Sequence, residues 1–251
     1  MFELPHKQYI VASLLGLLLI PVLALAAPDY PREKRWAEEI IEGLLVGQPI
    51  YLSQQNSHRF LGLHAEVKQA KMGVVVVHGM GLHPDWGVIS TLRQRLFDLG
   101  YTTLSIQMPV LAADASPKEY SAVFPEAAER LQLAVNYLKK KGHRHIAIVS
   151  HSNGSRMSRV YMSNNPPDVT AWVALSLTQG ETFDGINTPI LDLYGEHDLP
   201  HVLSSTAARK TSIKSTAASK QMVIPDTDHF YSDHEEIVIK AINQFLSQLH
   251  P

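Results

Sequence analysis

Apolar and polar positions follow two different periods along this chain. Short runs of apolar residues, typical of strands buried on both faces of a sheet, lie at 72–77, 101–108, 146–149, 170–177, 189–194 and 221–224. Apolar residues at three- and four-residue spacing predict helices at 85–99, 126–141, 156–162 and 235–249. Because strands and helices alternate, we expect a doubly wound, mostly parallel sheet with helices on both faces.

Two segments precede this alternation. Residues 30–45 are charged with interleaved apolar residues, which predicts a peripheral amphipathic helix; a solvated lead-in segment is the alternative. Residues 48–67 hold two apolar stretches on either side of a polar turn, which is typical of an antiparallel hairpin at a sheet edge. The expected organisation is a peripheral segment at 27–47 and one domain at 48–251.

The first 26 residues have the composition of a targeting segment. Lys7 lies in a short polar lead, residues 10–25 are almost wholly apolar, and Ala24 and Ala26 are small residues of the kind a signal peptidase reads. This predicts a signal peptide at 1–26 and an exported protein, with the bacterial periplasm as its location. An uncleaved membrane anchor is the alternative, but the apolar run is shorter than the roughly 20 residues of a spanning helix and contains Pro21. We expect no membrane span after cleavage.

Length, charge and cysteine content exclude several classes of function. The 251 residues suit one domain with a sizeable core. The net charge of −2, without an extended basic stretch, argues against a nucleic-acid partner. The chain has no cysteine, which excludes disulfides, thiolate metal sites and cysteine nucleophiles.

The stretch 145–155, HIAIVSHSNGS, carries the candidate nucleophile. An apolar strand is followed by small polar residues and then by a segment that can form a helix. A serine at the apex of such a turn exposes its hydroxyl, and the helix behind it directs its positive end at the reacting atom. Ser152 is therefore the candidate nucleophile, and the neighbouring His151 is expected to point into the packing behind the turn.

The match to the Gly-x-Ser-x-Gly pattern of a nucleophile elbow is incomplete. Gly154 occupies the second glycine position, whereas Ser150 replaces the first. Serine is small enough to fit there. A serine- and asparagine-rich loop that only caps a helix is the alternative interpretation.

A base and an acid follow at the ends of two later predicted strands. Asp198 lies in the loop after 189–194, and His229 lies in the loop after 221–224. Loops after parallel strands open on the edge of the sheet where ligands bind, so both residues are expected near Ser152. Glu196 is the main rival to Asp198 as the acid. Three further carboxylates are alternatives: Asp192 lies inside the strand, and Asp226 and Asp228 lie beside the histidine and could orient it.

The oxyanion hole is expected at the turn His78-Gly79-Met80-Gly81, which follows the strand at 72–77. Glycines let the backbone turn away and present N–H groups above the sheet. In a serine hydrolase the second donor is the residue after the nucleophile, so the backbone N–H groups of Met80 and Asn153 are the candidates. An ordinary glycine turn is the alternative.

Taken together, these motifs resemble the α/β-hydrolase superfamily: an HG turn, an SHSNG elbow, a Gly-x-x-Asp198 loop and an Asp-His229-Phe loop in that order. More narrowly, the chain resembles an uncharacterised group of exported bacterial proteins with this fold, which share the HG turn and a Ser-x-Ser-x-Gly-like elbow. The resemblance covers residues 48–251. It implies an α/β-hydrolase fold and hydrolysis of an ester or related acyl bond.

The expected function is that of a serine hydrolase with the triad Ser152, His229 and Asp198, acting on a small-molecule or lipid-like acyl substrate. The alternative is a non-catalytic binding or assembly module of the bacterial cell envelope that keeps the fold. No cofactor is expected. A catalytic metal is disfavoured because the histidines near the ligand edge show no HExxH or comparable spacing; they are His78, His83, His197, His201 and His229.

Overall fold

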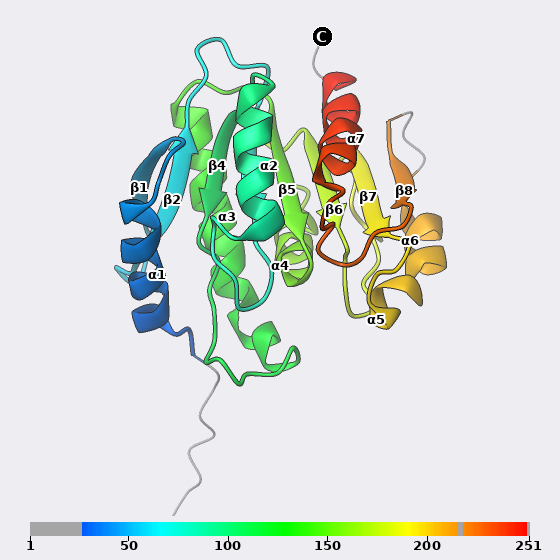
Figure 1. Ribbon diagram of the computed structural model, residues 1–251, viewed down its shortest axis with the longest axis horizontal. Coiled ribbons are helices and arrows are strands. Elements are labelled where there is room, and N and C mark those ends of the chain that lie inside the picture. Colours follow the sequence, from blue (N-terminus) through cyan, green and yellow to red (C-terminus); the bar gives the residue numbers. More distant parts are fainter. Residues whose placement is uncertain (1–26, 215–217, 250–251) are drawn as a thin grey trace, which may run out of the picture.

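The computed structural model describes residues 27–214 and 218–249, and its centre is a single eight-stranded sheet (Figure 1). The strands are β1 (Gln48–Ser53), β2 (Arg59–Ala65), β3 (Gly73–Val77), β4 (Thr102–Ile106), β5 (Ile146–His151), β6 (Ala171–Leu175), β7 (Ile190–Gly195) and β8 (Lys220–Ile224). Their spatial order is β1-β2-β4-β3-β5-β6-β7-β8. Strands β3 to β8 run parallel, whereas β2 pairs antiparallel with both β1 and β4.

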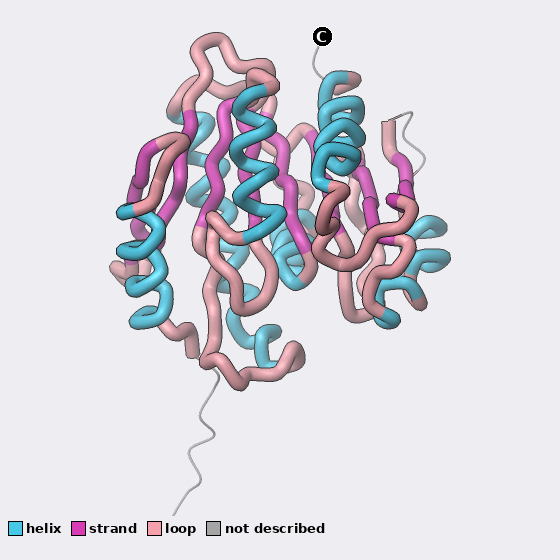
Figure 2. Tube along the Cα trace, in the orientation of Figure 1, coloured by secondary structure: helices cyan, strands magenta, loops and turns pink. Residues whose placement is uncertain are grey.

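Helices cover both faces of this sheet. They are α1 (Tyr30–Glu42), α2 (Gly87–Asp98), α3 (Phe124–Lys140), α4 (Asn153–Met162), α5 (Pro200–Leu203), α6 (Thr206–Ser212) and α7 (Glu235–Ser247). In Figure 1, α2 and α7 lie on the near face and α3 and α4 on the far face; Figure 2 shows the same layers coloured by type. The prediction of a mostly parallel, doubly wound sheet is therefore confirmed.

The central strands β3 to β6 are buried along their whole length because both of their faces are covered. Successive side chains of β3 point to opposite faces: Val75 and Val77 pack with α3 and α4, while Val74 and Val76 pack with α2 and α7. All five residues of β3 are buried. This two-sided core fixes the strand ends, and with them the loops that follow each parallel strand.

The predicted edge hairpin is also present, with β1 at the end of the sheet and Gln48 paired with His64. Helix α1 packs on it through Ala37 and Ile40, which contact Leu61 and Leu63 of β2. Residues 30–42 therefore form a helix packed on the body rather than a solvated lead-in.

One helix differs in detail from the expectation. Helix α3 begins at Phe124, two residues early, since Pro125 is favoured in a first helical turn. The connection between β4 and α3 contains a short 3-10 helix, η1 (Glu119–Val123), whose Tyr120 is buried. The predicted signal peptide at 1–26 lies outside the described residues. No helix of residues 27–214 or 218–249 is long and apolar enough to cross a membrane.

Candidate active site

Ser152 sits at the sharp turn between β5 and α4. Its backbone adopts φ 57° and ψ −126°, a region that non-glycine residues rarely occupy and that marks functional turns. The turn is held by a hydrogen bond of 2.8 Å from the Ser152 N–H to the Leu175 carbonyl of β6. At Gly154 the backbone of His78 comes so close that a Cβ atom would lie 2.2 Å from its carbonyl oxygen, so the helix can start here only with glycine.

Ser150, which replaces the first glycine of the elbow pattern, is accommodated by its own hydrogen bonds. Its Oγ accepts from the indole N–H of Trp172 at 2.9 Å and lies 3.1 Å from Ser155 Oγ. All three residues are fully buried. Ser150 therefore fits into the elbow without distorting it, because its hydroxyl has hydrogen-bond partners in Trp172 and Ser155.

His229 bridges Ser152 and Asp198. Its Nε2 lies 2.8 Å from Ser152 Oγ, and its Nδ1 lies 2.6 Å from Asp198 Oδ1. Because an ionised carboxylate only accepts, Nδ1 carries the proton and Nε2 is free to accept the serine proton. The three residues come from the loops after β5, β7 and β8, which share one edge of the sheet.

Asp198 is buried and receives several donors. Ser176 Oγ donates to Oδ2 at 2.5 Å, and the Leu199 N–H donates to Oδ1 at 2.8 Å. Burial alone would raise the pKa of Asp198, but the hydrogen bonds from His229, Ser176 and Leu199 outweigh it, so that the pKa is lowered. The acid therefore stays ionised beside the imidazole.

The rival carboxylates lie elsewhere. Glu196 is exposed and accepts from the backbone N–H of Asp226 at 3.0 Å. Asp228 accepts from the Phe230 N–H. Asp192 is fully buried and pairs with Arg209 at 2.8 Å. Of the carboxylates considered in the sequence, the structure brings Asp198 to the imidazole.

The HG turn lies beside the elbow, and His78 holds it. This buried imidazole accepts from the Met108 N–H through Nε2 at 2.9 Å and donates from Nδ1 to the Gly79 carbonyl at 2.8 Å. Burial lowers the pKa of His78 to about 3, so the ring is neutral. Since Gly79 C=O and Met80 N–H belong to one planar trans peptide, this bond also fixes the direction of the Met80 N–H.

The second oxyanion candidate is the N–H of Asn153, the first residue of α4. A first-turn N–H has no partner within its helix. Among the backbone bonds of the described residues, neither this N–H nor that of Met80 has a partner. Both residues line the cavity above Ser152.

His151 is buried, as expected, but it also takes part in the site. Its ring nitrogen Nε2 lies 2.9 Å from the backbone carbonyl of His229, to which it donates, and the two rings are 4.9 Å apart. Burial, followed by the proximity of His229, lowers the pKa of His151 to about 4. The residue before the nucleophile thus anchors the loop that carries the base.

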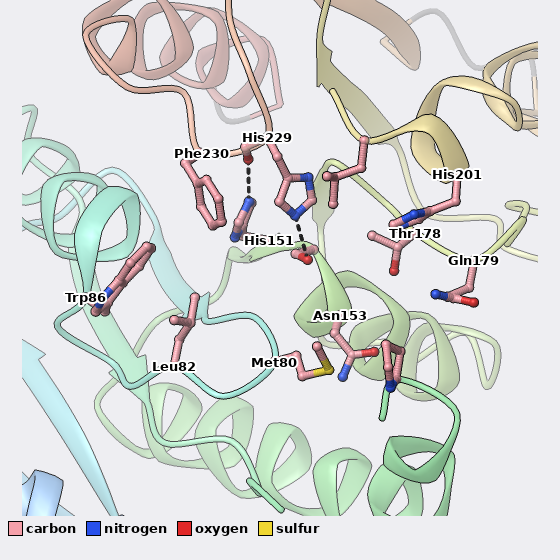
Figure 3. A pocket seen from close by; sticks show the side chains of 13 residues that line it. Met80, Leu82, Trp86, His151, Asn153, Thr178, Gln179, His201, His229 and Phe230 are labelled. Atoms are coloured by element: carbon pink, nitrogen blue, oxygen red, sulfur yellow. Dashed lines mark hydrogen bonds between the residues drawn. The ribbon is translucent and has the colours of Figure 1, made fainter. Parts of the chain in front are cut away.

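A cavity of about 260 Å³ opens above these groups (Figure 3). Besides the residues already named, it is lined by Leu82, Trp86, Pro117, Thr178, Gln179, Leu199, His201 and Phe230. Pro117 belongs to the connection between β4 and α3. Thr178 and Gln179 were missed, although their position just after β6 is the same signal that marks Asp198 and His229.

The five histidines near the ligand edge do not share one centre. His78 and His229 have the separate partners described above. Within residues 27–214 and 218–249, only Glu196, His197 and Asp226 bring possible metal-ligating atoms within 4.8 Å of one another. All three are exposed, and exposed groups of this kind are common without a metal.

Known proteins match this chain in fold more clearly than in sequence. A family model described as a protein of unknown function, DUF3530, matches residues 21–130, a part that contains the HG turn but none of the three bridged residues. Among curated proteins, none matches the chain in sequence.

Solved structures match the fold closely. Est1E from Butyrivibrio proteoclasticus is 16% identical, with a TM-score of 0.64 over 80% of this chain and 98% of its own. A dienelactone hydrolase from Anabaena variabilis is 17% identical, with a TM-score of 0.66 over 81% of this chain and 100% of its own. XC6422 from Xanthomonas campestris, an α/β serine hydrolase without a lid, is 13% identical, with a TM-score of 0.62 over 82% and 96%. The chain has the α/β-hydrolase fold.

Proposed function

We propose that this protein is a serine hydrolase that cleaves a carboxylic ester or a related acyl bond. The observation that carries the proposal is the position of His229, whose two ring nitrogens lie 2.8 Å from Ser152 Oγ and 2.6 Å from Asp198 Oδ1. Nucleophile, base and orienting acid are thus in hydrogen-bond contact before any substrate binds.

The proposed reaction has two halves. Ser152 Oγ attacks the acyl carbon while His229 Nε2 takes its proton, and the backbone N–H groups of Met80 and Asn153 stabilise the negative oxygen that forms. His229 then gives the proton to the departing alcohol, and the acyl group stays bonded to Ser152 Oγ. A water molecule, deprotonated by the same nitrogen, attacks the acyl carbon. The bond to Ser152 Oγ breaks, His229 returns the proton to the serine, and the acid is released. Asp198 keeps the imidazole oriented and stabilises its positive charge throughout.

The structural relatives support the same class. The Anabaena protein is a dienelactone hydrolase, and the Xanthomonas protein is a serine hydrolase. The non-catalytic module remains the competing function. A non-catalytic module would have no physical reason to keep a hydroxyl, an imidazole and a carboxylate in line at the floor of a cavity.

An active-site probe tests the proposal. A fluorophosphonate should label the purified protein, and Ser152→Ala should abolish the labelling. Ser163→Ala, which changes an exposed serine just after α4, is the matched control and should label like the unaltered chain. Labelling that persists in Ser152→Ala would show that the nucleophile is another residue. A folded protein that no phosphonate or acyl probe labels would favour the binding module.

Export is the second part of the proposal, supported by the sequence of residues 1–26. Expressed in a Gram-negative bacterium, the full chain should be recovered from the periplasm with its N-terminus at Ala27. A full-length chain retained in the membrane fraction would instead support the uncleaved anchor.

A further inference from the structure

The cavity has two chemically different walls on either side of Ser152 and His229 (Figure 3). We propose that the substrate is an uncharged ester that joins a short apolar acyl group to a hydroxyl-bearing alcohol such as glycerol or a sugar. This inference rests on the proposed hydrolase function. It assigns the apolar wall to the acyl group and the polar wall to the alcohol.

The apolar wall is formed by Leu82, Trp86 and Phe230. The rings of Trp86 and Phe230 meet edge to face with their centroids 5.6 Å apart. Phe230 remains 43% exposed although it lines the cavity. Exposed aromatic surface beside a nucleophile is stabilised when a ligand covers it, because burial of apolar area is favourable by about 25 cal/mol per Å².

The polar wall is formed by Thr178, Gln179 and His201, which Figure 3 shows on the opposite side of His229; the apolar Leu199, two residues before His201, also lines the cavity. They offer a hydroxyl, an amide and an imidazole. Within the part of the chain that the structure describes, none of these side chains has a hydrogen-bond partner. Gln179 also has a φ of 64°, a backbone conformation that costs free energy and is typical of ligand sites.

A buried ion pair holds this wall in place. Arg209, fully buried and paired with Asp192, donates to the carbonyl of Leu177 at 3.3 Å and to the carbonyl of Val202 at 2.9 Å. Leu177 precedes Thr178 and Val202 follows His201, so one guanidinium fixes both segments of the wall. The polar groups are therefore positioned before a ligand arrives, which reduces the entropy lost on binding.

The charge and size of the cavity limit the substrate. No lining residue is an aspartate, glutamate, lysine or arginine, so a charged group would lose its hydration without gaining an opposite charge. The volume of about 260 Å³ is below the roughly 300–1,000 Å³ of most ligand pockets. A neutral ester with a short acyl chain fits both limits.

Two specificity ratios test the assignment in the full-length protein. Monohexanoylglycerol should be hydrolysed with a higher kcat/KM than ethyl hexanoate, which lacks the alcohol hydroxyls, and than monoacetylglycerol, which lacks the apolar chain. Thr178→Val and Gln179→Leu should lower the glyceryl-to-ethyl ratio by about three- to tenfold for each hydrogen bond lost. Trp86→Ala and Leu82→Ala should instead lower the hexanoyl-to-acetyl ratio by about tenfold.

The controls change the same residue types away from the cavity. Thr211→Val, on the exposed side of α6, and Gln132→Leu, on the exposed side of α3, should leave both ratios unchanged. Variants of either wall that change both ratios equally would overturn the two-wall assignment. A preference for an apolar alcohol on a hydroxylated acid would overturn its direction.

Failure of this inference is distinguishable from failure of the proposed function. If the unaltered protein reacts with a fluorophosphonate at Ser152 yet shows neither preference, the substrate class is wrong and the hydrolase function stands. If Ser152 does not react, the hydrolase function fails and the substrate class fails with it.

Discussion

Ser176 Oγ donates a hydrogen bond of 2.5 Å to Oδ2 of Asp198, the carboxylate whose other oxygen contacts His229. The hydroxyl of Tyr231 lies 2.6 Å from the same serine oxygen. Ser176 has one proton and gives it to the carboxylate, so the proton in the second contact comes from Tyr231, whose hydroxyl also lies 3.1 Å from the Leu193 carbonyl. Both hydroxyls are buried behind the triad, and together they stabilise the ionised form of Asp198.

Removal of this donor should change both rate and pH dependence. We expect Ser176→Ala to lower kcat about tenfold, because a hydrogen bond to a charged group contributes about 1.5–3 kcal/mol. The pKa of Asp198, which is lowered in the folded protein, should rise, since the lost donor favoured the ionised form. Asp198 and His229 share a hydrogen-bonded proton, so the pair should be protonated more readily and activity should be lost at a higher pH on the acid side, which a profile of kcat/KM against pH would measure.

Two further variants should give a smaller and a larger effect than Ser176→Ala. Tyr231→Phe keeps the buried ring but removes the second proton donor, so it should shift the acid limb in the same direction by less. Asp198→Asn should cost about four orders of magnitude in kcat, as the equivalent change does in a well-studied protease. An acid limb that stays in place in Ser176→Ala would show that this serine only fills space.

Replacing Ser150 by the glycine of the common elbow motif should destabilise the protein rather than improve it. Ser150→Gly restores the common Gly-x-Ser-x-Gly motif, yet it leaves the buried indole N–H of Trp172 without its acceptor. We expect a loss of about 1–3 kcal/mol in the free energy of unfolding, measured by urea denaturation. Ser150→Ala separates the loss of the hydroxyl from the loss of the Cβ atom, since it removes only the hydroxyl. We expect it to lower the free energy of unfolding by a similar amount. A stabilised Ser150→Gly would contradict this account of the elbow.

The sequence predicts most of this site because its signals are local. Ser152, Asp198 and His229 each follow an apolar run, and loops after parallel strands share one edge of the sheet. Two-sided burial makes β3 apolar and makes β5 apolar as far as Val149, so both strands are visible in the sequence as apolar runs. The fold class and the convergence of these three residues therefore follow from strand order.

The supporting residues are not predictable in the same way. Ser176 and Thr178 also follow a strand, but single hydroxyl residues are common in loops, and only their contacts distinguish them. Tyr231 has a polar role because its hydroxyl reaches Ser176 across 55 residues of sequence. The buried pair of Asp192 and Arg209 is likewise set by packing, which no spacing along the chain reveals.

Two buried histidines should make the fold sensitive to acid. Burial lowers the pKa of His151 to about 4 and that of His78 to about 3, whereas an unfolded histidine titrates near 6.5. The unfolded chain therefore binds more protons as the pH falls below about 6.5. The stability that these neutral rings contribute is present above that pH and is lost toward pH 4 and below, by about 1.4 kcal/mol per pH unit for each ring.

The contribution of one ring can be isolated by substitution. In His151→Gln, the slope of unfolding free energy against pH between about pH 6 and pH 4.5 should be smaller than in the unaltered protein, by roughly one proton. His145→Gln changes an exposed histidine just before β5 and should leave the slope unchanged. Equal slopes in all three proteins would show that His151 titrates normally in the folded state.

Helix α1 is tied to the body by a charge buried beneath it. Glu33 forms a bidentate pair with the fully buried Arg130 of α3, with Nη1 2.9 Å from Oε2 and Nη2 3.2 Å from Oε1. The same carboxylate accepts from the Val110 N–H at 3.2 Å. Glu33→Ala would leave the guanidinium buried with Glu126 as its remaining carboxylate. We therefore expect a loss of about 3–5 kcal/mol in the free energy of unfolding, measured by denaturant titration.

The matched change is Glu38→Ala on the same helix. Its carboxylate pairs with Lys34 at 3.8 Å at the surface, where such a pair contributes about 0–1 kcal/mol. The two alanines have equal helix propensity, so the difference between the variants measures the buried pair rather than the helix. Replacement of both Glu33 and Arg130, by Gln and Met, should recover part of the loss because no unpaired charge remains buried. If Glu33→Ala is no more destabilising than Glu38→Ala, α1 is held by its apolar contacts with β2 alone.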